Sequence, residues 1–215
     1  MSSNDFFRCQ GCQGPSGPGC YYFGGAPHAD FHLKLYADPD CPANDPVVKF
    51  CAPGVGGIVT CPCGNPQVPI GATKGCNNFA AGGTGGAILS GSGVASIAAD
   101  TLGFDFNLGV GTSVTVLFQG TTNTVNARTG AGVRCVGGVL KRLYKGDEVA
   151  GSISFPNVAV SVHDRSLAKG YAITPPVTLF YYCAYRNSAA NGQPGCPGLT
   201  FGFNASNAGA VGWGP

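Results

Sequence analysis

Short runs of alternating apolar and polar residues recur from about Ala87 to Trp213. Side chains that alternate with a period of two point to opposite faces of a strand, so each run predicts a β-strand with one buried face. Gly, Asn or Pro separates most of the runs, as in tight turns. The predicted strands are residues 87–90, 94–98, 102–108, 113–119, 139–144, 151–155, 158–163, 177–186, 199–203 and 210–213.

The gaps between these runs are too short for the helical crossovers that parallel strands require, so turns should join the strands into antiparallel pairs. The 36 Gly and 16 Pro among 215 residues also oppose long helices, because Gly costs about 1 kcal/mol per helical position and Pro about 3. A hydrophobic content of 44% argues against disorder. We predict an all-β fold, an antiparallel, jelly-roll-like β-sandwich stabilised by disulfides.

The first 49 residues differ from the rest in being rich in Cys, Gly and Pro. Their main apolar material is the alternating run at residues 31–36. So few apolar side chains cannot form an independent core. We therefore predict an irregular N-terminal extension that mediates assembly, residues 1–49, and a β-sandwich domain, residues 50–215.

Charged side chains make up only 10% of the chain, and the formal net charge is +2. Nucleic-acid-binding domains carry basic stripes. The densest basic cluster here, which contains Lys141, Arg142 and Lys145, is followed at once by Asp147 and Glu148. We expect no nucleic-acid partner. A surface so poor in charge is weakly protected against association, so the expected partner is a second copy of the chain.

Eleven cysteines are far more than a reduced cytosolic β domain carries without a metal cluster. They predict disulfides and an oxidising compartment, so we expect an extracellular or cell-surface location. The sequence has no apolar stretch of about 20 residues to span a membrane. Residues 1–5 lack the basic start of a signal peptide. We therefore expect a processed or engineered terminus, or another export route.

The second part of the chain contains a series of short motifs in a fixed order. They are Cys61-Pro62-Cys63-Gly64-Asn65, Gly75-Cys76-Asn77-Asn78, Val133-Arg134-Cys135-Val136-Gly137-Gly138, Tyr185-Arg186-Asn187, Phe203-Asn204 and Val211-Gly212-Trp213-Gly214-Pro215. With these motifs the chain, from about Phe50 to Pro215, resembles a domain of secreted bacterial proteins from planctomycetes and myxobacteria. This family has no established activity or ligand, so the resemblance implies secretion and a β-rich disulfide fold. Relatives usually carry a polar residue at the position of Cys183, and the first 50 residues have no counterpart.

Six cysteines of the family-like part are disulfide candidates. The sequence leaves their connectivity open. The natural pairs, which close local loops or tie the last strand to the sheet, are Cys51 with Cys61, Cys63 with Cys76, and Cys135 with Cys196.

The other five cysteines are candidates for disulfides between segments or between subunits. Because their number is odd, at least one is free, metal-bound or joined to another chain. We expect Cys183 to pair with a cysteine of the N-terminal extension, in the same copy or a neighbouring one. The five are Cys9, Cys12, Cys20, Cys41 and Cys183.

Two possible metal sites are the alternatives to a chain without cofactors. Cys9 and Cys12, with two further cysteines, have zinc-ligand chemistry but lack a second close pair. Asp38, Asp40 and Asp45 supply oxygen ligands suited to calcium. Asp also initiates turns for local reasons. We expect no cofactor, with calcium as the alternative.

The residues that could support catalysis do not form a recognisable set. His163, Asp164 and Ser166 are triad residue types, but adjacent residues of a strand point to opposite faces. No Gly-x-Ser-x-Gly elbow precedes a helix. We expect no enzymatic activity.

The expected function is that of a secreted or cell-surface structural protein that self-assembles into a filament or matrix. An alternating segment can add as a strand to the sheet edge of the next copy. Head-to-tail contacts of this kind form filaments when they do not close. The side chains of the assembly strand are Phe31, Leu33, Leu35 and Tyr36.

The alternative function is a monomeric module that binds carbohydrate or cell-wall polymer. Tyr181 and Tyr185 share one face of the predicted strand 177–186 and are its candidate surface aromatics. The competing interpretation is a central strand that is buried on both faces.

Overall fold

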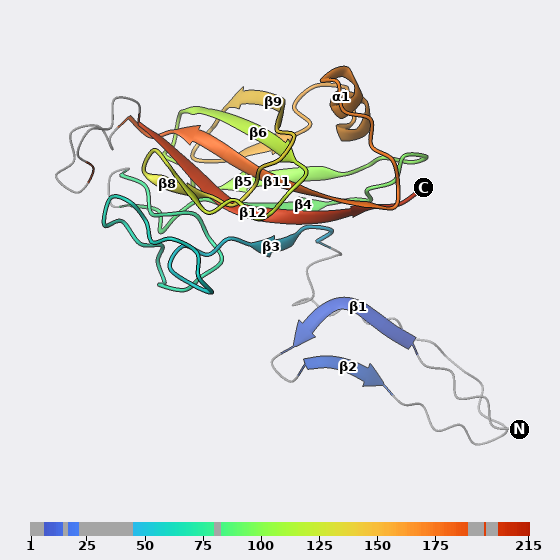
Figure 1. The fold of residues 1–215 in the computed structure, drawn as a ribbon, viewed down its shortest axis with the longest axis horizontal. Coiled ribbons are helices and arrows are strands. Elements are labelled where there is room, and N and C mark those ends of the chain that lie inside the picture. Colours follow the sequence, from blue (N-terminus) through green and yellow to red (C-terminus); the bar gives the residue numbers. More distant parts are fainter. Residues whose placement is uncertain (1–6, 15–16, 22–44, 80–82, 189–195, 197–201) are drawn as a thin grey trace, which may run out of the picture. The chain divides into compact units, whose positions relative to one another are not determined.

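The computed structural model describes residues 7–14, 17–21, 45–79, 83–188, 196 and 202–215. The chain divides into two compact units, Met1–Asp45 and Pro46–Pro215. In the first unit, β1 (Phe7–Gly14) and β2 (Gly17–Tyr21) form an antiparallel hairpin, seen in Figure 1. The sequence did not indicate this hairpin.

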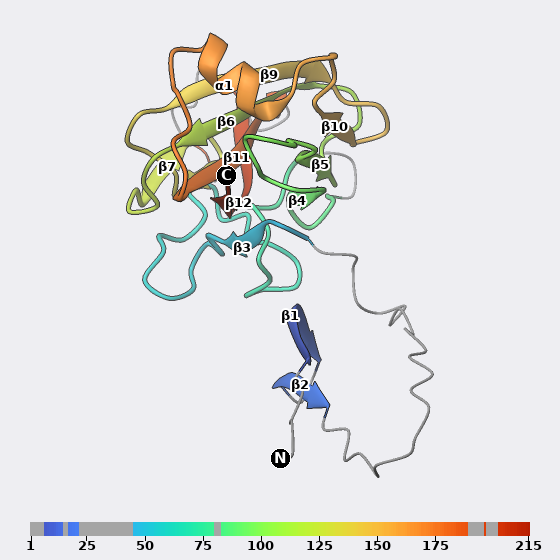
Figure 2. The ribbon, with the colours of Figure 1, turned by 90° about the vertical axis from the view of Figure 1, so that its right-hand side faces the viewer.

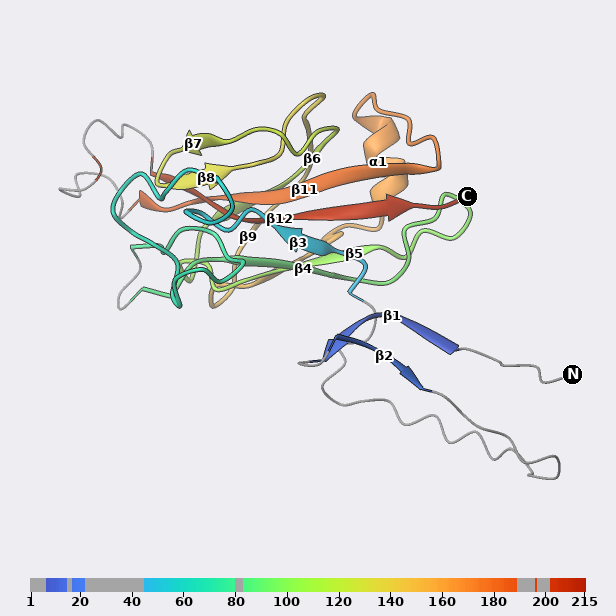
Figure 3. The same ribbon diagram turned by 60° about the horizontal axis from the view of Figure 1, so that its bottom comes forward.

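The second unit is an antiparallel sandwich of two sheets, drawn in Figures 1 and 3. One sheet has the strand order β3-β12-β11-β6-β9, and the other the order β10-β5-β4. The predicted all-β fold is therefore confirmed. The strands are β3 (Val48–Phe50), β4 (Ile88–Ser92), β5 (Gly103–Asn107), β6 (Val114–Gly120), β7 (Ala127–Thr129), β8 (Gly132–Arg134), β9 (Lys141–Asp147), β10 (Ile153–Phe155), β11 (Val177–Arg186) and β12 (Phe203–Trp213).

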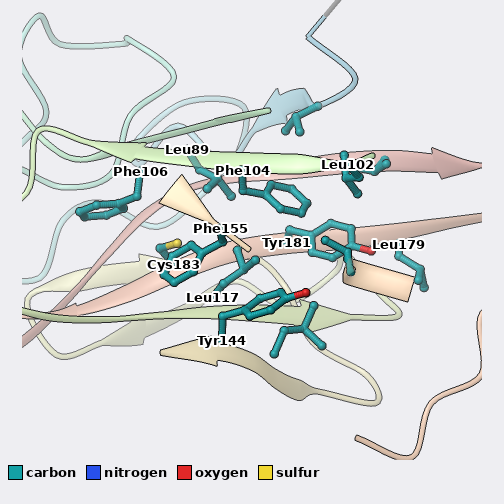
Figure 4. Packing of buried hydrophobic residues seen from close by; sticks show 14 of the residues in the cluster. Leu89, Leu102, Phe104, Phe106, Leu117, Tyr144, Phe155, Leu179, Tyr181 and Cys183 are labelled. Carbon is teal, nitrogen blue, oxygen red and sulfur yellow. The ribbon is translucent and has the colours of Figure 1, made fainter. Parts of the chain in front are cut away.

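The main core lies between the two sheets. Leu89, Phe104 and Phe106 of the three-stranded sheet are buried against Tyr181 and Tyr185 of β11. The rings of Phe104 and Tyr181 have centroids 4.7 Å apart, and those of Phe106 and Tyr185 are 5.2 Å apart. Figure 4 shows Leu89, Phe104, Phe106 and Tyr181 in this core. The alternation in the sequence thus places one row of each strand in a shared core.

The opposite face of the five-stranded sheet, here called the outer face, is also covered. Irregular loops from residues 51–76 and the hairpin β7–β8 lie over it (Figure 3). Their close approach requires glycine: a Cβ on Gly75 would lie 1.9 Å from the Ala205 carbonyl oxygen, and one on Gly132 would lie 2.6 Å from the Ala205 nitrogen. The long strand β11 is consequently buried on both faces, with Tyr182 packed on this side.

The predicted strand at residues 158–163 is wrong, because the helix α1 (Val162–Ala168) begins there. Ser161 is its N-cap, and the Ser161 Oγ accepts a hydrogen bond from the Asp164 main-chain N–H. Val162 and Ser166, four residues apart, form the buried side of the helix. Figure 2 shows α1 beside β9. The alternating valines have the sequence pattern of a strand, but the serine that caps the main chain marks the start of a helix.

Several other predicted strands differ from the structure, either in where they end or in not being strands. Residues 94–98 form an irregular segment in which Ser96 bridges to Gly214. Most of the predicted strand 199–203 lies outside the described residues, and β12 begins at its last residue. The short strands β3, β7 and β8 were not predicted. Within the described part of the chain, no helix has the length and apolar character needed to cross a membrane.

Candidate functional site

The six disulfide candidates of the sandwich form three disulfides, Cys51–Cys135, Cys61–Cys76 and Cys63–Cys196. The predicted pairs were wrong. Proximity in the sequence does not decide the pairing, because these loops lack strand ladders and run across the outer face. Cys51 and Cys63 therefore meet partners 84 and 133 residues away.

Cys183 is a free thiol with no exposed surface, so its predicted disulfide is wrong. It lies in β11 among the apolar side chains of the main core. Burial raises the pKa of the thiol well above its usual value, and the Glu148 carboxylate raises it further. The thiol is therefore protonated and closed to a neighbouring chain. The side chains of Cys9, Cys12 and Cys20, and the whole of Cys41, lie outside the described residues.

The tyrosines proposed as a carbohydrate platform are buried. Tyr181 and Tyr185 have no exposed surface, and burial raises the pKa of each hydroxyl well above its usual value. The prediction of surface aromatics is wrong because the three-stranded sheet covers this face of β11. The competing interpretation, a central strand buried on both faces, describes β11.

A chain of buried hydrogen bonds connects α1 to the core. Trp213 Nε1 donates to the Tyr181 hydroxyl at 2.9 Å, and that hydroxyl donates to Gln119 Oε1 at 3.3 Å. Gln119 Nε2 donates to Ser166 Oγ at 2.9 Å. Ser166 Oγ in turn donates to the Tyr171 main-chain carbonyl at 2.8 Å. Ser166 is thus occupied in holding the helix to the sheet.

The triad residue types near α1 do not form a triad. His163 Nδ1 lies 3.1 Å from Asp164 Oδ1, and the main-chain N–H of His163 donates to Asp100 Oδ2 at 2.7 Å. Ser166 makes its hydrogen bonds to Gln119 and to the main chain instead. These side chains fix the start of the helix and its contact with the sheet.

Glu148 is the one glutamate of the sequence, and it is buried. Its carboxylate accepts hydrogen bonds from Ser113 Oγ at 2.7 Å, Thr115 Oγ1 at 2.6 Å and the Val110 N–H at 3.1 Å. These bonds tie the loop between β5 and β6 to the end of β9. The described residues contain no group of three or more His, Cys, Asp or Glu side chains placed to hold a metal.

The remaining predicted site residues fall mostly outside the described part of the chain. Asp38 and Asp40 of the calcium hypothesis are outside it, while Asp45, the last residue of the first unit, is partly buried. The assembly strand at residues 31–36 is also outside the described residues.

Two asparagines from the family-like motifs hold the irregular loops in place. Asn65 Nδ2 donates to the carbonyls of Asn77 at 2.6 Å and Ala131 at 3.1 Å. Asn204 Nδ2 donates to the carbonyl of Cys76 at 3.1 Å. Such buried amides replace the missing strand ladders, because main-chain groups away from water need partners. Sequence reasoning missed this role, although their place beside the motif cysteines was the available signal.

The first residues of the second unit, from Pro46 onward, are the best candidate for a functional site. Val47 is only 3% exposed. A Cβ on Gly91 of β4 would lie 2.3 Å from Val47 Cγ2, and one on Gly209 of β12 would lie 2.0 Å from Val47 Cγ1. Two glycines from different sheets thus make room for one valine, which packs between β4 and β12.

Val47 leads directly into the edge strand β3. Val48 pairs with Ala210 of β12, and Phe50 pairs with Ala208. The Val48 side chain is 71% exposed, whereas the Phe50 ring packs edge-on against Phe180 with centroids 5.8 Å apart. We call residues 46–50, together with the β4 and β12 residues that receive them, the β3 seam. Three residues are too few for a sequence pattern to reveal such a strand.

Cys51 closes the β3 seam. It has a φ of 70°, in the left-handed region, and it is disulfide-bonded to Cys135. From Cys51 onward the chain is therefore fixed covalently to the sandwich. Residues 46–50 are held to β12 and β4 by packing and strand pairing.

Comparisons of the chain with family models, with curated proteins and with solved structures found no match. The resemblance to the secreted bacterial domain therefore stays a prediction. The function is argued below from the geometry of this chain.

Proposed function

We propose that this chain is a secreted or cell-surface structural protein whose copies assemble through the N-terminal unit, Met1–Asp45. One observation carries the proposal: the sandwich covers its own apolar faces, whereas the described part of the first unit is a lone two-stranded hairpin. An isolated hairpin is at best marginally stable in water. It gains stability from disulfides or from packing on another chain, and this unit carries four cysteines.

The sandwich has the properties of a durable building block. Its central strand is covered on both faces, and three disulfides staple the outer loops. A disulfide typically contributes about 2–4 kcal/mol by restricting the unfolded chain. Disulfides of this kind persist in oxidising compartments, which supports an extracellular location.

The buried polar side chains of the described residues support a structural function of the protein better than a catalytic one. Ser166 and Glu148 are committed to hydrogen bonds that hold elements together. The alternative function, carbohydrate binding, loses the two residues on which it rested, because Tyr181 and Tyr185 are buried.

The proposed mechanism is strand addition. The apolar side chains of residues 31–36 add to a sheet edge of the next copy, where main-chain hydrogen bonds supply affinity and alternate side chains fill pockets. Because donor and acceptor are different surfaces, the contact is head-to-tail and extends into a filament.

The test compares two double variants of the full chain. Leu33→Asp/Leu35→Asp places charges in the apolar row and should abolish polymers in light scattering and negative-stain microscopy. The matched control His32→Asp/Lys34→Asp alters the intervening positions of the same run and should still assemble. Equal assembly of both variants, or a wild-type chain that stays monomeric at every concentration, would contradict the proposal. Circular dichroism checks that both variants fold.

A further inference from the structure

We propose that the acidic N-terminal unit of one copy docks on a basic surface beside the β9 edge of the next copy. This surface, here called the β6–β9 surface, lies on the outer face of the five-stranded sheet. The inference rests on the proposed self-assembly and names the surface that receives the N-terminal unit. The residues of the surface are Val114, Val116 and Phe118 of β6, Arg142 and Lys145 of β9, and Arg186 of β11.

The strand register places apolar and basic side chains side by side on this face. The outward residues of β6 alternate with inward ones such as Leu117, which lies in the main core. Phe118 pairs with Arg142, whose guanidinium carbon lies 5.8 Å from the centroid of the ring. Val116 pairs with Lys145, and directly opposed residues of an antiparallel pair share a face. The row of β6 therefore runs beside two cations of the edge strand.

The cations of the surface are available to a partner. Arg186 follows the inward-facing Tyr185 and so points to the outer face. Arg142, Lys145 and Arg186 are all exposed. None of the three forms an ion pair with another residue of the described part of the chain. Asp147 lies at the end of β9, beyond both cations of that strand. The surface thus presents three unneutralised positive charges around an apolar row.

The two units of the chain carry opposite net charges. Residues 1–45 contain five Asp against one Arg and one Lys, a net charge of −3, whereas residues 46–215 contain ten basic and five acidic residues, a net charge of +5. Opposite charges draw the N-terminal unit of one copy toward the sandwich of another, and like charges disfavour contacts between two sandwiches. Charge complementarity therefore identifies the N-terminal unit of a second copy as the occupant of the β6–β9 surface.

One segment of that unit matches the surface in pattern as well as in charge. The alternating run at residues 31–36 is preceded by Asp30 and followed by Asp38 and Asp40. Its apolar side chains recur at every second residue, as do the outward side chains of β6. In extended chains this repeat is about 7 Å. We expect the apolar side chains of the run to cover the β6 row while the aspartates at its ends lie against the cations.

The β6–β9 surface adjoins the opposite edge of the sheet from the one at which the N-terminal unit leads into the sandwich. That unit precedes β3, one edge strand of the five-stranded sheet, and β9 is the other. Ten residues separate Tyr36 from Pro46, and they span at most about 35 Å. Within one chain the segment would have to cross β12 and β11, whose outer face is already covered. A neighbour aligned edge to edge presents its β9 instead. Each copy then donates at one edge and accepts at the other, which extends into a filament.

The first test reverses the charge of the surface in the full-length chain. Arg142→Glu/Lys145→Glu should raise the concentration needed for assembly, measured by light scattering, by about tenfold or more, because like charges then face each other. The matched control Arg128→Glu/Lys169→Glu changes the net charge equally at two exposed positions outside the surface and should assemble like the wild type. Equal assembly of the two variants overturns the proposal. Circular dichroism checks that both variants fold.

The second test reverses the charge of the docking segment. Asp38→Lys/Asp40→Lys alone should also impair assembly. An equimolar mixture of this variant with Arg142→Glu/Lys145→Glu should recover it, because each chain then offers the other a complementary contact. Recovery in the mixture identifies a contact between copies rather than within one chain. A mixture that assembles no better than its two components overturns the proposal.

Salt and a competing ligand complete the experiment. Assembly should weaken as NaCl rises, because the Debye length falls from about 10 Å at 0.1 M to about 3 Å at 1 M. If the wild type assembles and Arg142→Glu/Lys145→Glu assembles equally well, this inference fails and the proposed function stands. A wild-type chain that remains monomeric contradicts both. If that monomer bound polygalacturonate and the Arg142→Glu/Lys145→Glu variant did not, the β6–β9 surface would be a polysaccharide site instead.

Discussion

The side-chain amide of Asn207 pairs with the main chain of Leu89 as a neighbouring strand would. Asn207 Oδ1 accepts the Leu89 N–H at 2.7 Å, and Nδ2 donates to the Leu89 carbonyl at 3.1 Å. Asn207 lies where the register of β12 against β11 shifts, between the partners of Tyr182 and Ala184. The bulge turns one amide toward the edge strand β4 and so joins the two sheets.

Removing that amide should destabilise the sandwich. Asn207→Ala leaves two buried main-chain groups of Leu89 without partners, and we expect the free energy of unfolding in urea to fall by about 2–4 kcal/mol. Asn207→Asp should cost at least as much, because it sets an acceptor against the Leu89 carbonyl. The exposed Asn157, whose Nδ2 donates to the Lys145 carbonyl, is the control. Asn157→Ala should change stability by less than about 0.5 kcal/mol. Equal effects at both positions would refute the bridging role.

The packing of the β3 seam predicts a position-specific effect of small substitutions in β12. Gly209→Ala places a Cβ 2.0 Å from Val47 Cγ1, and overpacking of this kind costs about 1–3 kcal/mol. Adding Val47→Ala should recover part of that loss, because the colliding methyl group is gone. Gly212→Ala in the same strand meets nothing within 4 Å and should be nearly neutral. Thermal unfolding of the wild type, both single variants, the double variant and the Gly212→Ala control gives the comparison. Strictly additive losses in the double variant would speak against the contact.

Buried hydroxyl and thiol groups make the sandwich sensitive to alkaline pH. Burial raises the pKa of Tyr144, Tyr181 and Tyr185 well above 10.0, and that of Cys183 well above 9.0. Above those usual values the unfolded chain loses these protons while the folded chain retains them. The stabilising contribution is therefore complete below about pH 8.5 and declines as the pH rises. Urea midpoints should fall steadily from about pH 9 to pH 11; a flat profile would contradict this assignment.

Tyr185 offers a matched variant for that experiment. Burial raises the pKa of its hydroxyl, and the Asn78 side chain beside it lowers that pKa by less, but the hydroxyl makes no hydrogen bond of normal geometry. Tyr185→Phe should therefore be nearly neutral at pH 7 and should flatten the alkaline decline. Tyr181→Phe also removes a titrating group but deprives Trp213 Nε1 of its acceptor. It should lower stability at pH 7 by about 1–3 kcal/mol. The opposite order of the two variants at pH 7 would show that the Tyr181 network has no structural value.

The disulfide connectivity is directly measurable. Proteolysis of the oxidised protein without reductant should release a peptide pair joined through Cys51 and Cys135 and another joined through Cys63 and Cys196. Alkylation of Cys183 should occur only after denaturant is added, because the thiol is buried. Recovery of a Cys51–Cys61 pair from native protein would contradict this structure.

The strands with long, regular alternation could be predicted from the sequence. Val177–Arg186 was predicted to the residue, because ten consecutive residues of high strand propensity fix both the element and its two faces. The same pattern left two interpretations open, surface aromatics on one face or a strand buried on both faces, and the second describes β11. Burial of Tyr181 and Tyr185 depends on the three-stranded sheet, whose position is a property of the tertiary fold.

Patterns among neighbouring residues did not predict the structure correctly where contacts between distant residues determine it. The alternating valines before α1 suggested a strand, although Ser161 caps a helix. The cysteine pairing failed because irregular loops bring distant residues together. The β3 seam depends on single atoms of Val47 set against two glycines from strands far apart in the sequence. The alternation of apolar and polar residues along the sequence does not predict such a contact between distant residues.

The disulfide at Cys51 also sets how far a mechanical load on the N-terminal unit can travel into the sandwich. A pull on Met1–Asp45 reaches β3 first and can peel its hydrogen bonds from β12 one at a time. The five residues before Cys51 then extend by at most about 17 Å. There the tension meets the Cys51–Cys135 disulfide, which lies in the apolar cluster on the outer face and not in the main core. Residues 46–50 therefore extend under load before the disulfide does, and the two sheets of the sandwich stay packed together.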